Sequence, residues 1–196
     1  VAYSSLSPLS YCLLALFAVA AAGASNPAAT TSALSGTILQ LFNHGLSAAA
    51  LFFCVGVLES RAGGRRGLAD FGGVRTAAPV FAGLCGVAMF SSLGLPGLNG
   101  FVGEFLIFNG IFGLAPWAAA VATLGLLATA LFLLTFWQRV FHGPAAGAGL
   151  GFRDLDAHEI ATLLTLAALM VTLGLCPQLL AGSLIPLVTT WAAQLP

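Results

Sequence analysis

The chain has 196 residues, of which 59% are hydrophobic and only 6% are charged, and its mean hydropathy is +1.03. A soluble domain carries about 25% charged residues, so this composition excludes a soluble globular protein and indicates a polytopic membrane protein in a lipid bilayer. Six arginines balance six aspartates and glutamates, and lysine is absent. Because the net charge is zero, no overall field attracts nucleic acid, and we expect no nucleic-acid partner.

Five apolar stretches reach the length of about 20 residues that a membrane-spanning helix needs. They cover about residues 1–23, 34–58, 77–113, 116–141 and 158–176. The first opens at Val1 without an initiator methionine, so we expect the chain to be a piece of a longer protein. The linker ASNPAATTS, which is rich in turn formers, separates the first stretch from the second.

The third stretch is too long for one straight crossing, since residues 77–113 as a continuous helix would measure about 55 Å. We predict one discontinuous helix over 77–93 and 98–113, because both arginine-bearing loops, 59–76 and 142–157, then lie on the same side, as the positive-inside rule requires of a cytoplasmic side. The predicted helix-break residues are Gly94, Pro96, Gly97 and Gly100.

The predicted fold is an all-α polytopic membrane protein with about five transmembrane helices, the third of them discontinuous. Residues 1–176 form the helical bundle. The last segment, 177–196, is short and contains Pro186, so we expect a terminal interfacial or partly inserted helix. The four cysteines lie far apart in apolar runs and are interpreted as small buried hydrophobic residues rather than metal ligands. They are Cys12, Cys54, Cys85 and Cys176.

Glu104 is the only acid or arginine well inside a predicted span. A charge in hydrocarbon costs at least about 2.5 to 3.5 kcal/mol, and the broken backbone beside it needs protein or water as a partner. Glu104 is either a neutral acid bonded to a neighbouring helix or a protonatable carrier reached by water, and we favour the carrier. The glycines at every third position, from Gly94 to Gly103, fit close helix packing and unwound backbone equally well.

His44 lies in the middle of the second span, with Gln40 four residues before it and Ser47 three residues after it. These three hydrogen-bonding groups are predicted to share one helix face, which Asn43 flanks. Such a stripe can join helices by hydrogen bonds or relay protons, and the pattern leaves both open. We predict a proton-translocation path formed by Glu104, His44, Gln40 and Ser47.

The sequence contains no phosphate-binding loop, no cysteine cluster for iron–sulfur ligation and no nucleophile–base constellation. We therefore expect no catalytic residue, metal or cofactor in this chain.

Several runs of residues together resemble one family. They are VAYSSLS, LQLFNHGLSAAALFF, GLADFGG, PVFAGLCGVAMFSSLGLPGLNGFVGEFLIFNG, RVFHGP and GLCPQLL. The chain is similar to the antiporter-like, proton-pumping subunits of bacterial respiratory complex I, NADH:quinone oxidoreductase. GRRGLADFGG and RVFHGP resemble chain M more than chains L and N.

The resemblance implies a bundle of two inverted repeats, each with a broken helix, of which this chain holds most of the second repeat and the last helix. It implies that Glu104 is the ionisable group on the exit side and that His44 belongs to a polar axis leading to a lysine further upstream. Pro8 stands where many relatives have histidine. The family's upstream glutamate and lysines are absent, so this piece alone is not expected to pump.

The function implied is a proton half-channel coupled to quinone reduction, in a multi-pass subunit of the bacterial inner membrane that contacts neighbouring antiporter-like subunits. The chain is then an enzyme only as part of the complex, and other subunits bind quinone, NADH, flavin and iron–sulfur clusters. Two alternatives stay open: a Na⁺/H⁺ antiporter subunit of the multisubunit type, and a membrane anchor of a hydrogenase-like complex.

Overall fold

The structure is a computed structural model that describes residues 2–145 and 151–194, and these residues form helices and connecting turns without a strand. A 3-10 turn, η1 (Ala2–Ser5), precedes α1. The α-helices are α1 (Leu6–Ala22), α2 (Pro27–Arg61), α3 (Val74–Ala77), α4 (Pro79–Ser92), α5 (Asn99–Leu114), α6 (Pro116–Phe141), α7 (Ala157–Leu175) and α8 (Gln178–Ala192).

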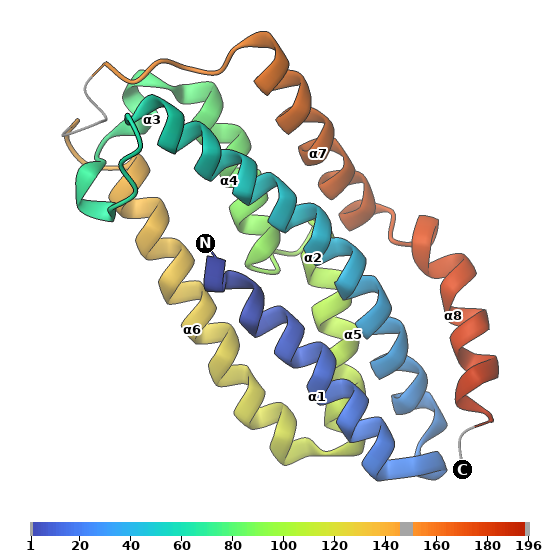
Figure 1. Ribbon diagram of the computed structural model, residues 1–196. Coiled ribbons are helices and arrows are strands. Elements are labelled where there is room, and N and C mark those ends of the chain that lie inside the picture. The colour runs from blue at the N-terminus through green and yellow to red at the C-terminus, as the bar shows by residue number, and fades with distance from the viewer. Residues whose placement is uncertain (1, 146–150, 195–196) are drawn as a thin grey trace.

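The predicted all-α membrane architecture is confirmed. Within the described residues, four helices are long and apolar enough to cross a membrane: α1 with its preceding 3-10 turn, α2, α6 and α7. Helices α4 and α5 are each shorter, and they follow one another end to end as the two halves of the predicted discontinuous span. Figure 1 shows this pair running beside α2, with α6 on one side of the bundle and α7 and α8 on the other.

The second span is longer than predicted, since α2 begins at Pro27 and not near residue 34. The Asn26 side chain accepts a hydrogen bond from the Ala29 N–H at 3.2 Å, and Pro27 occupies the first helical position, where its missing N–H is not needed. The turn formers of ASNPAATTS therefore start the helix early. At 35 residues, α2 is about 52 Å long and runs the length of the bundle.

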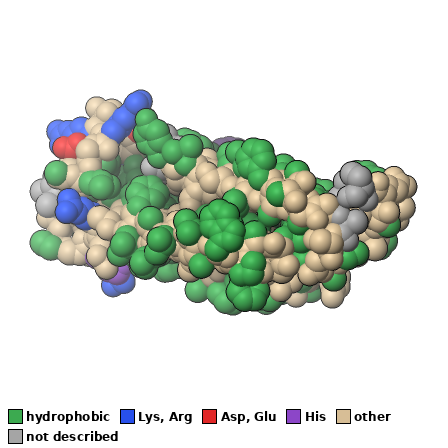
Figure 2. Space-filling model, turned by 90° about the horizontal axis from the view of Figure 1, so that it is seen from below, with side chains coloured by type: hydrophobic (Ala, Val, Ile, Leu, Met, Phe, Trp, Pro, Cys, Tyr) green, Lys and Arg blue, Asp and Glu red, His purple; other side chains and the backbone are tan. Residues whose placement is uncertain are grey.

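Charge is concentrated at one end of the molecule. Apart from Glu104, every arginine, aspartate and glutamate lies in residues 59–75 or 139–159. The two segments meet, because the Gly73 N–H donates to the His142 carbonyl at 3.1 Å and Arg61 pairs with Glu159 at 2.9 Å. Figure 2 shows the charged side chains gathered at one end of an otherwise largely apolar face. The expectation that both arginine-bearing loops lie on the same side is confirmed; that this side is cytoplasmic stays a prediction.

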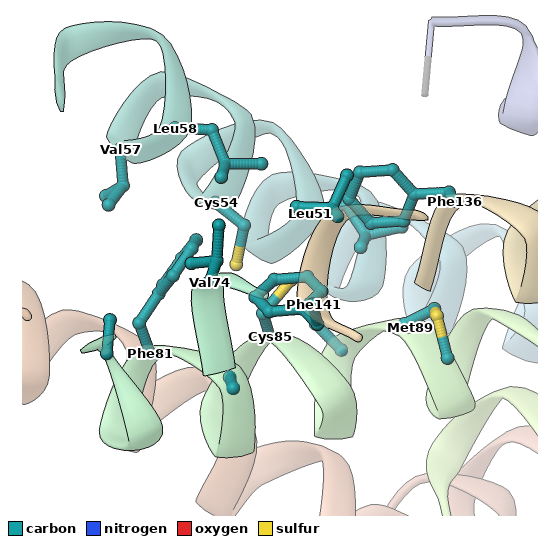
Figure 3. Close-up of a cluster of buried hydrophobic side chains, with 14 of the residues drawn as sticks. Leu51, Cys54, Val57, Leu58, Val74, Phe81, Cys85, Met89, Phe136 and Phe141 are labelled. Carbon is teal, nitrogen blue, oxygen red and sulfur yellow. The ribbon is translucent and has the colours of Figure 1, made fainter. Parts of the chain in front are cut away.

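A buried cluster near the charged end packs α2, α4 and α6 together (Figure 3). Phe81 and Phe141 lie at its centre, with ring centroids 5.5 Å apart. Three of the four cysteines, Cys12, Cys54 and Cys85, are buried as expected. The expectation is wrong for Cys176, which is exposed because α7 ends at Leu175 and leaves Cys176 at the outer junction with α8.

The terminal segment forms α8, with Pro186 inside the helix. Figure 1 shows α8 continuing in the direction of α7, beside the N-terminal half of α2. Its position at the membrane interface stays a prediction.

Candidate functional site

The interruption between α4 and α5 is a turn that two glycines make possible. Gly94 and Gly97 have φ angles of +68° and +94°, in the left-handed region that favours glycine. The Gly94 N–H donates to the Ser91 carbonyl at 3.1 Å, which closes the end of α4. Pro96, between the glycines, has no N–H that would need a partner. Gly94, Pro96 and Gly97 therefore form the interruption that the sequence predicted.

Gly100, the fourth predicted break residue, is helical instead and belongs to the first turn of α5. A Cβ there would overlap the Ser91 carbonyl oxygen, so the missing side chain lets the two half-helices approach each other. Gly103 is helical too, and a Cβ on it would lie 2.8 Å from the Gln40 Cα. The two readings of the glycine series therefore both apply, at different positions: the first two glycines unwind the chain and the last two permit packing.

Glu104 lies in the second turn of α5, with only 9% of the residue exposed. Its Oε1 accepts a hydrogen bond from Gln40 Nε2 at 3.4 Å. Its Oε2 lies against the break, since a Cβ on Gly94 would overlap that oxygen. The carboxylate is therefore enclosed between α2 and the turn, as its cost in hydrocarbon led us to expect.

Close packing of α2 on α5 brings Gln40 to Glu104. A Cβ on Gly36 of α2 would lie 2.5 Å from the Ile107 backbone nitrogen, and one on Gly110 of α5 would lie 2.6 Å from the Ala33 Cα. Small residues at such positions allow membrane helices to approach through their backbones. The Glu104 site depends on this contact.

A buried polar cluster joins α2, α4 and α5 at the break. Asn43 Nδ2 donates to the Asn99 carbonyl at 2.8 Å, and Asn99 Nδ2 donates to the Asn43 carbonyl at 3.2 Å. The hydroxyls of Ser47 and Ser91 are 2.8 Å apart, and Ser91 Oγ donates to Asn99 Oδ1. None of the four residues is more than 3% exposed. The cluster thus links the end of α4 and the start of α5 to α2 through hydrogen bonds that lipid could not provide.

Sequence reasoning predicted Ser47 in this group, noted Asn43 only as a neighbour, and missed Ser91 and Asn99. A signal was present, because Ser91 stands just before the break and Asn99 opens the second half-helix in LGLPGLNG. Polar side chains on both sides of a helix break are expected where freed backbone groups must be satisfied.

His44 is only half-buried and no hydrogen bond of it is found among the described residues, so it lies outside the cluster. The cluster therefore contains Asn43 and Ser47 of α2 and leaves His44 out, and the path through Gln40, His44 and Ser47 stays a prediction. At 100° per residue, Gln40, His44 and Ser47 span about 60° of the helix, and so do Gln40, Asn43 and Ser47. His44 and Asn43 lie on opposite flanks of Gln40, and only the Asn43 flank meets Asn99.

The end of α7 also packs against the break. A Cβ on Gly174 would lie 2.5 Å from the Leu98 Cα and would overlap the Gly97 carbonyl oxygen. The break therefore depends on a second glycine contact, which the sequence analysis did not predict.

One carboxylate beside one amide can hold a proton or a monovalent cation, whereas Ca²⁺ and Mg²⁺ need six or more oxygen ligands. Within residues 2–145 and 151–194, no three His, Cys, Asp or Glu side chains are grouped so that they could hold a metal ion.

Comparisons with known proteins agree with this arrangement. Residues 1–131 match the family model described as NADH:quinone oxidoreductase/Mrp antiporter, TM. The chain is 36% identical over 178 residues to NADH-quinone oxidoreductase subunit M of Mycobacterium tuberculosis, covering 91% of this chain and 30% of that protein. It is 34% identical over 179 residues to subunit M of Rickettsia conorii, covering 91% and 34%. The chain thus spans about a third of the length of the curated relatives it matches.

Two solved structures share the fold. A chain of respiratory complex I from Thermus thermophilus with bound NADH matches with a TM-score of 0.63 and 25% identity, over 97% of this chain and 45% of that one. A chain of the Mrp complex from Dietzia sp. matches with a TM-score of 0.71 and 21% identity, over 98% and 47%. Because the family model covers well over half of the sequence, the chain belongs to the NADH:quinone oxidoreductase/Mrp antiporter transmembrane family.

Proposed function

We propose that this chain is part of subunit M, an antiporter-like membrane-arm subunit of a NADH:quinone oxidoreductase, and forms part of its proton half-channel. Support comes from the 34% and 36% identity to proteins with that name. The subunit would be multi-pass in the bacterial inner membrane and would contact neighbouring antiporter-like subunits. The redox cofactors, NADH and quinone would be bound by other subunits, and this chain would contribute no redox chemistry.

The observation that carries the proposal is a lone carboxylate enclosed at the break of its own helix. Ionised Glu104 accepts a hydrogen bond from Gln40 Nε2. Gln40 Oε1 is buried and has no partner among the described residues, so it is free to accept from a protonated Glu104 or from a water molecule once the amide turns. The Gln40 amide can thus form a hydrogen bond with Glu104 in either protonation state. This lowers the free-energy cost of protonating and deprotonating the carboxylate.

Polar groups lead away from Glu104 along α2 in both directions. Toward the charged end lie Asn43 and Ser47 with their partners in the cluster. Toward the other end, Ser32 Oγ donates to the Leu106 carbonyl at 3.0 Å and accepts from the exposed Asn109. We propose that water reaches Glu104 from one direction at a time, through the unwound turn, so that the proton is taken up on one side and released on the other.

The test is Glu104→Gln and Glu104→Ala in the full-length subunit within its complex. In membrane vesicles, NADH-driven proton pumping is expected to fall to background in both variants, because neither side chain can exchange a proton. Glu59→Gln is the matched control, since Glu59 lies at the charged end and pairs with Arg66. Undiminished pumping in both Glu104 variants, with assembly unchanged, would remove the assignment.

A second candidate is a Na⁺/H⁺ antiporter subunit of the multisubunit type. The observation that favours it is the likeness to the Mrp complex chain, whose TM-score of 0.71 exceeds the 0.63 of the complex I chain. At 21% identity that likeness concerns the fold alone. Sodium-dependent proton exchange in vesicles without NADH would favour this candidate over the first.

A further inference from the structure

A groove on the outer side of α4 ends at the break and is not lined by Glu104 or Gln40. It has a volume of about 720 Å³ and is lined by residues of α3, α4, the break and α6, among them Arg75, Gly83, Gly86, Pro96, Leu98 and Trp137. We propose that this groove binds an anionic phospholipid, with one acyl chain along α4 and the headgroup at Arg75. The proposal does not require Glu104 to carry protons.

The length of the groove fits one leaflet of a bilayer. Arg75 lies just before α4, and Pro96 and Leu98 lie just after it, so the groove follows the whole helix. The 14 residues of α4 span about 21 Å. One leaflet with its headgroup region is about 20–22 Å thick, half of the usual 40–45 Å. An acyl chain that starts at the charged end would therefore reach the break near the middle of the membrane.

The floor of the groove is shaped by missing side chains. A Cβ on Gly83 would have no atom within 4 Å, so the space above it is open. A Cβ on Gly86 would come within 3.0 Å of the Trp137 ring, which forms the wall. Tryptophan is enriched where acyl chains meet headgroups, and the surroundings of Trp137 suit a hydrocarbon chain.

The mouth of the groove is cationic. Among the described residues, the ion pairs engage Arg61 and Arg66 and leave Arg75 without an acidic partner. The exposed His142 ring packs against Trp137, with centroids 5.7 Å apart, and adds a second group able to bind an anion near the mouth. An apolar channel that ends at an unpaired arginine at the membrane surface suits an anionic lipid better than a neutral one.

The experiment uses the assembled complex in phosphatidylcholine nanodiscs that contain a small fraction of phosphatidylglycerol with a photoreactive group at the acyl end. Crosslinked peptides are mapped by mass spectrometry. We expect labelling within α4 and residues 95–98, and about fivefold less with a phosphatidylcholine probe of the same chain.

Two variants test the site from opposite ends. Gly83→Leu fills the hollow and should bring labelling to background, whereas Gly56→Leu, at another open helical glycine outside the groove, should not. Arg75→Gln should lower phosphatidylglycerol labelling about fivefold, with Arg153→Gln unchanged. Because Arg75 is exposed, this variant decides the question even if Gly83→Leu fails to assemble.

Three results would overturn the proposal. They are equal labelling by the two headgroups, Arg75→Gln labelling at the wild-type level, and crosslinks that join the groove to another protein segment instead of lipid. The last result would mean that a polypeptide covers α4 in the complex.

Discussion

The bundle contains two interruptions between consecutive apolar helices, one between α4 and α5 and one between α7 and α8. They differ in chemistry. Two glycines with left-handed φ angles form the first interruption, and a buried polar cluster and the Glu104 carboxylate lie beside it. Between α7 and α8 stand Cys176 and Pro177, and none of the buried polar side chains of the described residues lies there. The two interruptions touch at Gly174. A break in a membrane helix is therefore not a site by itself.

The difference lies in the side chains around the two turns. At the second interruption the Cys176 N–H donates to the Thr172 carbonyl at 2.8 Å, the Leu179 N–H donates to the Cys176 carbonyl at 3.2 Å, and Pro177 has no N–H to satisfy. That turn satisfies itself locally. The first turn is also closed by local backbone bonds, but polar side chains of α2 pack against the residues on both sides of it. Such buried polar groups can bind a proton or water.

The largest expected effect comes from a side chain at Gly94. Gly94→Ala and Gly97→Ala both place a Cβ at positive φ, with a strain of about 1–2 kcal/mol each. Only at Gly94 would the Cβ overlap the Glu104 carboxylate, whereas at Gly97 its nearest neighbour is Leu175 at 4.0 Å. Displacing a proton-transfer group by about 1 Å can cost on the order of 100-fold in rate.

NADH-driven pumping in vesicles is therefore expected to be lost in Gly94→Ala and largely kept in Gly97→Ala, at equal amounts of assembled complex. Equal loss in the two variants would show that backbone strain alone disables the break, and that the position of the Glu104 carboxylate is not what matters.

The next effect concerns the contact between the two interruptions. Gly174→Ala would push a methyl group into the backbone at Leu98, and overpacking of this kind costs about 1–3 kcal/mol. Gly182→Ala on α8 is the matched control, because a Cβ there meets nothing within 4 Å. We expect a lower thermal midpoint of the complex and reduced pumping in Gly174→Ala only. Identical behaviour of the two variants would mean that α7 does not support the break.

Periodicity and length predicted most of the fold, because they are local properties. The break was predictable from a largely apolar stretch of 37 residues with glycines and a proline in the middle, and Glu104 from the cost of burying a charge. The partners of Glu104 and of the break were not, because they depend on which faces of α2, α5 and α7 meet. His44 and Asn43 are adjacent in sequence, and only the packing distinguishes the half-buried His44 from the buried Asn43.

Asp154 is a similar case, since its partners lie far away in the sequence. Its Oδ2 accepts from the Val80 N–H and its Oδ1 from the Phe81 N–H, both at 3.0 Å, and so it caps α4, whose own N-cap residue Ala78 has no polar side chain. Asp154→Ala is expected to lower the free energy of unfolding by about 1 kcal/mol. The midpoint of thermal unfolding should then fall by about 2–4 °C. Asp70→Ala removes a cap in an exposed loop and should change the midpoint less. A midpoint unchanged by Asp154→Ala would show that α4 needs no cap.

The smallest expected effect on transport is that of His44→Ala. This variant tests whether Glu104 and the buried polar cluster form the proton path without His44. His44 is half-buried at the edge of α2 and lies outside the cluster that joins Asn43 to Asn99. Water can replace an imidazole in such a place, so pumping should fall only a few-fold and stay well above that of Glu104→Gln. His158→Ala, at the charged end, is the control. A loss as complete as that of Glu104→Gln would mean that protons must pass through His44, and that the path extends beyond the buried cluster and the break.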